Sequence, residues 1–167
     1  MTAMATVLNL DPSRPTVKIT AIGTPAPQGS KRHVGRGVMV ESSKKVKPWR
    51  EAVKSAALDF ISDADQYGRQ IGRLTDGFPL DGPLFAHMAF TLARPKSAPK
   101  SRLYPDRMPD LSKLVRATED ALTDAGVWAD DARVVSTLAR KLYPHPFSSD
   151  PDALAMPGAV IRIWTIQ

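Results

Sequence analysis

The segment from residue 109 to residue 131 concentrates the side chains of this chain that could do metal-assisted chemistry. It holds six carboxylates and only two basic residues, in a chain of 167 residues with a net charge of +6. The carboxylates belong to Asp110, Glu119, Asp120, Asp124, Asp130 and Asp131. Carboxylate oxygens are the ligands that Mg²⁺ prefers, and bound Mg²⁺ can polarise a phosphate ester and activate water. Such a cluster in a basic protein favours a metal site that works on a nucleic acid.

Two of these carboxylates flank a predicted helix. Ser112 is a suitable N-cap for a helix that begins near residue 113, and Gly126 ends it. Asp110 lies just before the helix, and the pair Asp130 and Asp131 opens the next strand. A helix followed by a turn can bring Asp110 and Asp131 together around one ion. Asp is also common at helix ends and turns, so the spacing alone leaves both roles open.

The predicted helix is amphipathic. Ser112, Arg116, Glu119 and Thr123 recur at helical spacing on one polar face. Arg116 is placed to pair with Glu119 and Asp120, which would contribute about 0.3 kcal/mol for each pair. The apolar face consists of Leu111, Leu114, Val115, Thr118, Ala121, Leu122 and Ala125.

Basic residues gather in two other segments. Residues 31–54 contain eight basic and two acidic residues, a local net charge equal to that of the whole chain, and residues 94–107 add five more basic residues. Basic residues also serve solubility, but clustering of this degree favours a bound polyanion. The predicted phosphate contacts are Lys31, Arg32, Arg36, Lys44, Lys45, Lys47, Lys113 and Lys141.

The elements that must position these residues alternate along the chain. Strands are predicted over residues 17–22, 84–94, 133–143 and 159–166, a short hairpin over 35–40, and helices over 48–61 and 113–125. Residues 62–82 are predicted as a long polar loop that could begin with an extension of the first helix. Trp49 belongs to the predicted core, and Trp128 covers a helix end or meets a partner subunit. The pattern indicates one α+β domain over residues 15–167, a small mixed sheet flanked by two main helices, after a flexible tail over 1–14.

Composition excludes several function classes. The chain has no cysteine, which excludes disulfides, thiolate metal sites and cysteine nucleophiles, and its three widely spaced histidines disfavour a zinc site. No apolar run approaches the roughly 20 residues that cross a bilayer, and no signal pattern opens the chain, so we expect a cytoplasmic protein.

The acidic segment resembles a motif of the RusA family of phage and bacterial Holliday-junction resolvases. That motif reads roughly Pro-Asp-x-Asp-Asn-Leu-x-Lys, then Asp-Ala-Leu, then Asp-Asp and a downstream Lys. The matching residues are Pro109, Asp110, Leu114, Asp120, Ala121, Leu122, Asp130, Asp131 and Lys141. The loop over residues 23–32 is similar to the family's Gly-x-Pro-x-Pro-Lys-x-Arg loop, and the element order agrees over about residues 17–166.

The resemblance implies an endonuclease that acts as a homodimer, uses Mg²⁺ or Mn²⁺, and nicks four-way DNA junctions symmetrically in recombination and repair. It implies that Asp110 and Asp131 are catalytic metal ligands, with Asp120 and Asp130 as further candidates. It also implies a phage or prophage protein that works in the bacterial cytoplasm.

Three positions depart from the family pattern. Ser112 stands where the family has its second Asp, Lys113 where it has Asn, and Arg116 where it has the catalytic Lys. A hydroxyl is a weak neutral ligand, and Arg116 can stabilise charge but cannot donate a proton near neutral pH. Glu119 lies on the face of Ser112, roughly 10 Å further along the axis, and is a candidate replacement carboxylate.

Two hypotheses follow from these residues. The first is a metal-dependent junction endonuclease, and the second is a junction-DNA-binding protein whose cleavage is attenuated at Ser112. A third hypothesis, a basic RNA-binding domain, is disfavoured because only 7% of the residues are aromatic.

Overall fold

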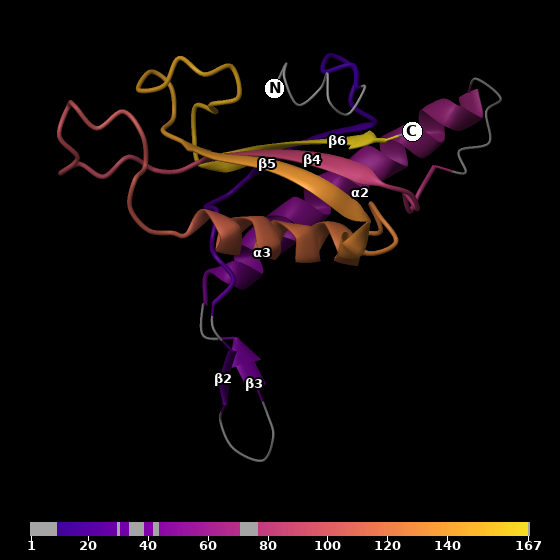
Figure 1. The fold of residues 1–167 in the computed structure, drawn as a ribbon, viewed down its shortest axis with the longest axis horizontal. Coiled ribbons are helices and arrows are strands. Elements are labelled where there is room, and N and C mark those ends of the chain that lie inside the picture. The colour runs from indigo at the N-terminus through magenta and orange to yellow at the C-terminus, as the bar shows by residue number, and fades with distance from the viewer. Residues whose placement is uncertain (1–9, 30, 34–38, 42–43, 71–76, 167) are drawn as a thin grey trace.

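The elements of the chain follow the predicted alternation of strands and helices (Figure 1). The computed structural model describes residues 10–29, 31–33, 39–41, 44–70 and 77–166. In chain order the elements are β1 (Val17–Ile22), β2 (Lys31–His33), β3 (Met39–Glu41), α2 (Val46–Gln70), β4 (Leu84–Thr91), α3 (Leu111–Asp124), the 3-10 turn η1 (Asp131–Arg133), β5 (Val134–Leu142) and β6 (Gly158–Thr165). This arrangement confirms the predicted α+β domain.

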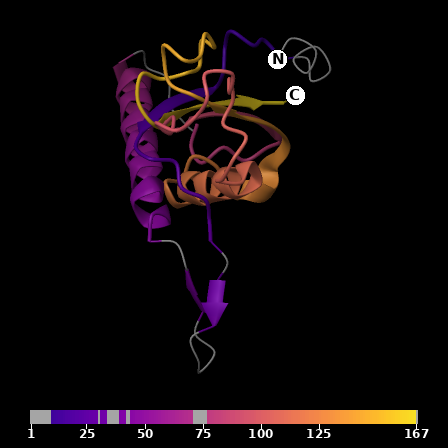
Figure 2. The same cartoon turned by 90° about the vertical axis from the view of Figure 1, so that its left-hand side faces the viewer.

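Four strands form one mixed sheet in the order β1-β6-β4-β5. β4 and β5 run parallel, whereas β6 pairs antiparallel with both β1 and β4. Parallel neighbours need a crossover connection, and α3 provides it between β4 and β5. Both helices cover the same face of the sheet (Figures 1 and 2), where alternate residues of β1, β4 and β6 join those of α2 and α3 in one core.

All eight residues of β4 are buried, including those that point away from the helices. Leu84, Ala86, Met88 and Phe90 alternate along the strand and lie in the core beneath the helices. The other face is also covered, because Phe85 stacks on Trp164 and the segment over residues 143–157 packs across the strand ends.

α2 is longer than its apolar pattern predicts. It begins at Val46 and continues to Gln70, so the residues after 61 form the helical extension rather than a loop. Trp49 is buried as predicted, and its indole Nε1 donates a hydrogen bond to the Thr118 hydroxyl of α3 at 3.2 Å. The polar composition of residues 62–66 reflects a solvated helix end that leaves the core, not a break in the helix.

The start of α3 differs from the prediction. Asp110, not Ser112, occupies the N-cap position, and its side chain makes no capping hydrogen bond. Ser112 lies in the first turn because the helix begins two residues earlier than its side chain suggested. Gly126 ends the helix as predicted, at φ +75°, the left-handed conformation that glycine adopts without strain.

The return from α3 to β5 also differs in detail. Asp131 begins the short turn η1 instead of a strand, and the Asp130 carboxylate accepts a hydrogen bond from the Ala132 amide at 2.8 Å. Trp128 is buried within its own chain, where its Nε1 donates to the Thr123 hydroxyl at 2.7 Å. Trp128 therefore covers the end of α3, one of its two predicted roles.

β2 and β3 pair antiparallel as a short hairpin that projects away from the sheet and helices (Figure 2). β2 begins four residues before the predicted hairpin, and residues 35–38 of the predicted span lie outside the described residues. The predicted phosphate contacts Lys31, Arg32 and Arg36 lie outside the residues whose side chains the structure describes. Residues 1–9 of the predicted tail also lie outside the described residues, whereas the Asp11 carbonyl accepts a hydrogen bond from Trp164 Nε1 at 2.9 Å.

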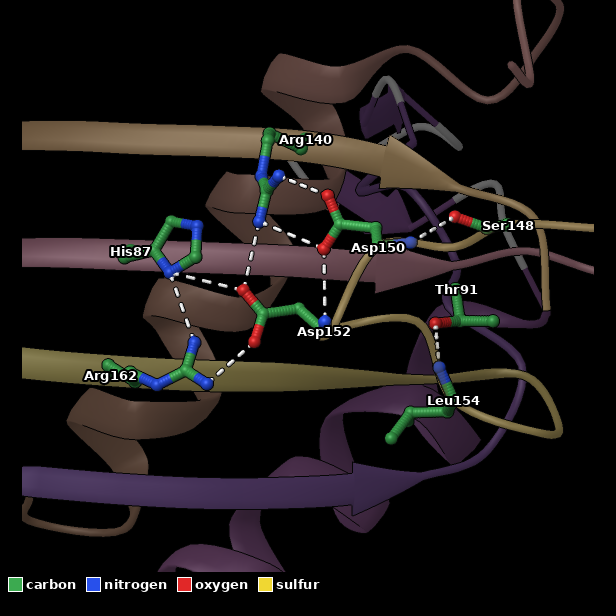
Figure 3. Close-up of polar contacts among 8 residues, drawn as sticks. All are labelled: His87, Thr91, Arg140, Ser148, Asp150, Asp152, Leu154 and Arg162. Carbon is green, nitrogen blue, oxygen red and sulfur yellow. Dashed lines mark hydrogen bonds and ion pairs between the residues drawn. The ribbon is translucent and has the colours of Figure 1, made fainter. Parts of the chain in front are cut away.

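A charged cluster holds the covering segment on the second face of the sheet (Figure 3). The buried Asp152 accepts hydrogen bonds from Arg162 at 2.6 Å and from Arg140 at 2.9 Å, and Arg140 also pairs with Asp150. His87 of β4 lies between them, with its Nδ1 3.4 Å from Arg162 and 3.9 Å from Asp152. Burial lowers the pKa of His87 to about 4, against the opposing charge of Asp152. The histidine is therefore neutral at pH 7.

Candidate metal-dependent active site

Two hydrogen bonds set the face that α3 presents to solvent. Trp49 donates to the Thr118 hydroxyl and Trp128 to the Thr123 hydroxyl, and the Thr118 hydroxyl also donates to the Leu114 carbonyl at 2.9 Å. Thr118 of the apolar face is buried, and Thr123, at the end of the predicted polar face, is half-buried against Trp128. The rest of the predicted polar face is turned outward. Its members in the first two turns, Ser112 and Arg116, are exposed, and Glu119 is half-buried.

The negative charges of two other carboxylates act on Glu119. Burial raises the pKa of its carboxyl, and the carboxylates of Asp131 and Asp120 raise it further, while the Arg116 charge opposes them. Asp120 is partly neutralised by Arg50 of α2 at 3.6 Å. Asp131 follows the helix in sequence, and the structure brings it close enough for its charge to act on Glu119 in the second half of the helix.

Asp110 lies at the other end of the helix. Its exposed carboxylate pairs with Lys113 at 3.2 Å. Nine residues separate it from Glu119, which corresponds to about 13 Å along the axis at about 1.5 Å per residue. Ligands of one Mg²⁺ lie about 2 Å from the ion, so one ion cannot bind both Asp110 and Glu119 in this arrangement.

The predicted carboxylates do not form a large cluster. Among the residues that the structure describes, no group of three or more His, Asp or Glu side chains could hold a metal ion. Glu119 and Asp131 are two carboxylates of the acidic segment whose charges act on each other. Asp130 is engaged in capping η1, and Asp120 faces Arg50.

Lys141 holds the segment that leads into α3. Its Nζ donates hydrogen bonds to the carbonyl oxygens of Arg107 at 2.8 Å and Pro109 at 3.1 Å. The backbone N–H of Gln28 donates to the Lys113 carbonyl at 3.0 Å, so the Gly/Pro-rich loop lies against the first turn of α3. These contacts fix the position of Asp110. The sequence predicts Lys141 only as a phosphate contact, and nothing in its spacing indicates the two carbonyls.

Some of the described basic residues lie near the start of α3. Lys44, Lys45 and Lys47 are exposed where α2 begins, and Lys45 shares a pocket with Pro109. Arg116 is exposed between the two groups of carboxylates. The arrangement places cations beside a helix face that carries carboxylates, as a site for a metal ion and a phosphate requires.

Residues 23–146, about three quarters of the chain, match the family described as Endodeoxyribonuclease RusA. The chain belongs to the RusA family. The matched region includes the Gly/Pro-rich loop, the whole acidic segment and Lys141, so it spans every position on which the resemblance rests. No curated protein matches the chain. No helix in the described part of the chain has the length and apolar character needed to span a membrane.

Proposed function

We propose that this RusA chain is a divalent-metal-dependent endonuclease that cuts four-way DNA junctions. Family membership implies a junction-resolving endodeoxyribonuclease, and the net charge of +6 suits a polyanionic substrate. The observation that supports metal dependence is the half-buried Glu119 beside Asp131 and Asp120, whose negative charges raise its pKa. A bound dication would offset this repulsion.

In this proposal, Glu119 and Asp131 hold the ion. Mg²⁺ is commonly bound through one or two carboxylates, with water and substrate phosphate as the remaining ligands. When bound, the metal would polarise the scissile phosphate and lower the pKa of an attacking water. Arg116, one turn before Glu119, stabilises negative charge on the phosphate and moves no proton, because its guanidinium stays charged. Lys44, Lys45, Lys47 and Lys113 contact neighbouring phosphates.

The proposed enzyme is a homodimer, because two subunits related by a two-fold axis place two sites on opposite arms of a junction. β5 lies at an edge of the sheet and exposes 63% of Val135, which makes this edge a candidate contact between subunits. A mass measurement in solution tests this part of the proposal.

The proposal is tested by incubating a labelled four-way junction with the protein and Mg²⁺, Mn²⁺ or EDTA. We expect paired symmetric nicks that require metal. The rate of nicking should fall about tenfold to 100-fold in Asp131→Asn and in Glu119→Gln. Asp59→Asn removes an exposed carboxylate from α2 and should cut at the normal rate. Loss of nicking in Asp110→Asn but not in Glu119→Gln would refute the assigned ligand pair and move the ion to Asp110.

A second candidate function is junction binding without efficient cleavage. Ser112 is neutral where the family has a carboxylate, and the described residues contain no group of three metal-binding side chains. Ser112 is exposed, so Ser112→Asp can restore the charge without disturbing the core. Tight binding without nicks, and nicks gained in Ser112→Asp, would support this candidate. A protein that neither binds nor cuts junctions in any form would refute both.

A further inference from the structure

A pocket of about 430 Å³ lies beside the N-terminal end of α3. Its walls come from residues 24–27, residues 92–95 and residues 102–109, together with Lys45 and Tyr143. The third wall continues directly into Asp110. The pocket is therefore adjacent to the helix that carries the proposed site, but no residue assigned to metal binding lines it.

The pocket is mostly apolar, and prolines restrict the backbone around it. Five of its lining residues are prolines, whose rings fix the backbone, and Leu92 and Tyr143 add further apolar surface. The two hydrogen bonds from Lys141 to the carbonyls of Arg107 and Pro109 hold one wall in place. The volume of this apolar pocket is larger than that of one aromatic ring system. A ligand of that size can therefore enter without opening the core.

The lining also carries positive charge. Lys45, Arg102 and Arg107 contribute three cations, and Asp106 pairs with the two arginines at 3.2 Å and 3.9 Å. One carboxylate against three cations leaves this lining positive. An apolar slot with a positive lining is complementary to a flat ring attached to a phosphate, which is the chemistry of a nucleotide in a DNA strand.

We propose that this pocket takes one unstacked base of the bound DNA, with the adjoining phosphate against Lys45, Arg102 and Arg107. This inference rests on the proposed function, because it requires a DNA strand that passes the start of α3. Extrusion costs least where stacking is already interrupted, as at the crossover of a four-way junction. A base held here would fix which phosphate faces Glu119 and Asp131, so the pocket would choose the cleavage position.

The test uses synthetic junctions in which 2-aminopurine replaces one base at a time around the crossover. The fluorescence of this base rises when it leaves the stack, and EDTA keeps the junction uncut during the measurement. We expect a several-fold rise at one position on binding of the full-length protein. Binding itself is followed separately by the anisotropy of a dye on a distant arm.

A matched pair of variants assigns that signal to the pocket. Ala93 is exposed and lines the pocket, so Ala93→Phe fills the slot from its edge without entering the core. Ser101 is also exposed, in the same connecting segment, but does not line the pocket, so Ser101→Phe adds the same ring elsewhere. We expect Ala93→Phe to remove the rise and to weaken junction binding about tenfold, the scale of losing one stacked base, and Ser101→Phe to do neither.

The outcomes separate this inference from the function on which it rests. Junction binding with no 2-aminopurine rise at any position overturns the pocket and leaves the junction enzyme intact. A rise that persists in Ala93→Phe places the extruded base elsewhere and also overturns it. Failure to bind junctions at all would refute the proposed function first.

Discussion

Acidification should destabilise this protein through one buried side chain, His87. The imidazole is 1% exposed and lies between the two strands that carry Arg140 and Arg162, with the Asp152 carboxylate beside it. Protonation would add a third cation to this pair of arginines, and only the Asp152 carboxylate would favour it. The protein must therefore take up this proton mainly by unfolding.

The magnitude follows from the two pKa values of His87. Burial lowers the pKa in the folded chain to about 4, compared with 6.5 when exposed, so the folded state binds fewer protons than the unfolded state. The stabilisation is complete above pH 6.5 and is lost as the pH falls toward 4. The full difference corresponds to about 3 kcal/mol, of which about 2 kcal/mol is lost between pH 7 and pH 5. Asp152 titrates below this window, because hydrogen bonding and the charge of Arg162 lower its pKa despite its burial.

The assay is urea unfolding at pH 7, 6 and 5 for the natural chain and for His87→Gln. The variant keeps a polar group toward Arg162 but has no proton to bind, so its unfolding free energy should fall by about 2 kcal/mol less over this range. His145→Gln, which changes an exposed histidine, should follow the natural chain. Parallel pH profiles for the natural chain and His87→Gln would refute the reasoning.

Three further predictions follow from contacts in the structure. Lys141→Met should slow junction nicking about tenfold or more, because the segment before α3 loses the two hydrogen bonds that support it. The salt dependence of junction binding should not change. If the slope of log binding constant against log salt concentration falls by about 1, Lys141 contacts a phosphate instead. Gly158→Ala places a Cβ 2.5 Å from the Ala21 carbonyl oxygen within the sheet and should cost about 2 kcal/mol in urea unfolding; a loss below about 0.5 kcal/mol would contradict this. Trp49→Phe removes the hydrogen bond to Thr118 and leaves a void, which should cost about 2 kcal/mol, and an unchanged melting temperature would count against it.

Much of the fold could be predicted because its elements are locally patterned. The predicted bounds of β1 agree with the structure, and those of the final strand differ by one residue at each end. Helical spacing predicts the buried face of α3, from Leu114 to Leu122. Local pattern failed where polar residues continue a helix, as in α2 after residue 61, and where Asp110 replaces Ser112 at the helix start.

The site was less predictable, because it depends on where the chain returns after α3. The rise of a helix separates Asp110 from Glu119 whatever the surroundings, but the position of Asp131 depends on the turn that Gly126 permits and Trp128 anchors. Sequence spacing left the sharing of one ion by Asp110 and Asp131 open for this reason. The His87 cluster is harder still, because its members meet only through strand register and a covering loop distant in sequence.

The two indole contacts to α3 have an optical consequence. Trp49 and Trp128 each donate a hydrogen bond to a threonine of this one helix, whereas Trp164 stacks on Phe85 at the far face of the sheet. Two of the three tryptophans in the chain thus sense the rotation of the helix that carries Arg116 and Glu119. Intrinsic fluorescence of Trp164→Phe would report only on these two. The protein therefore carries its own unlabelled probe of whether the helix turns when DNA or metal is added.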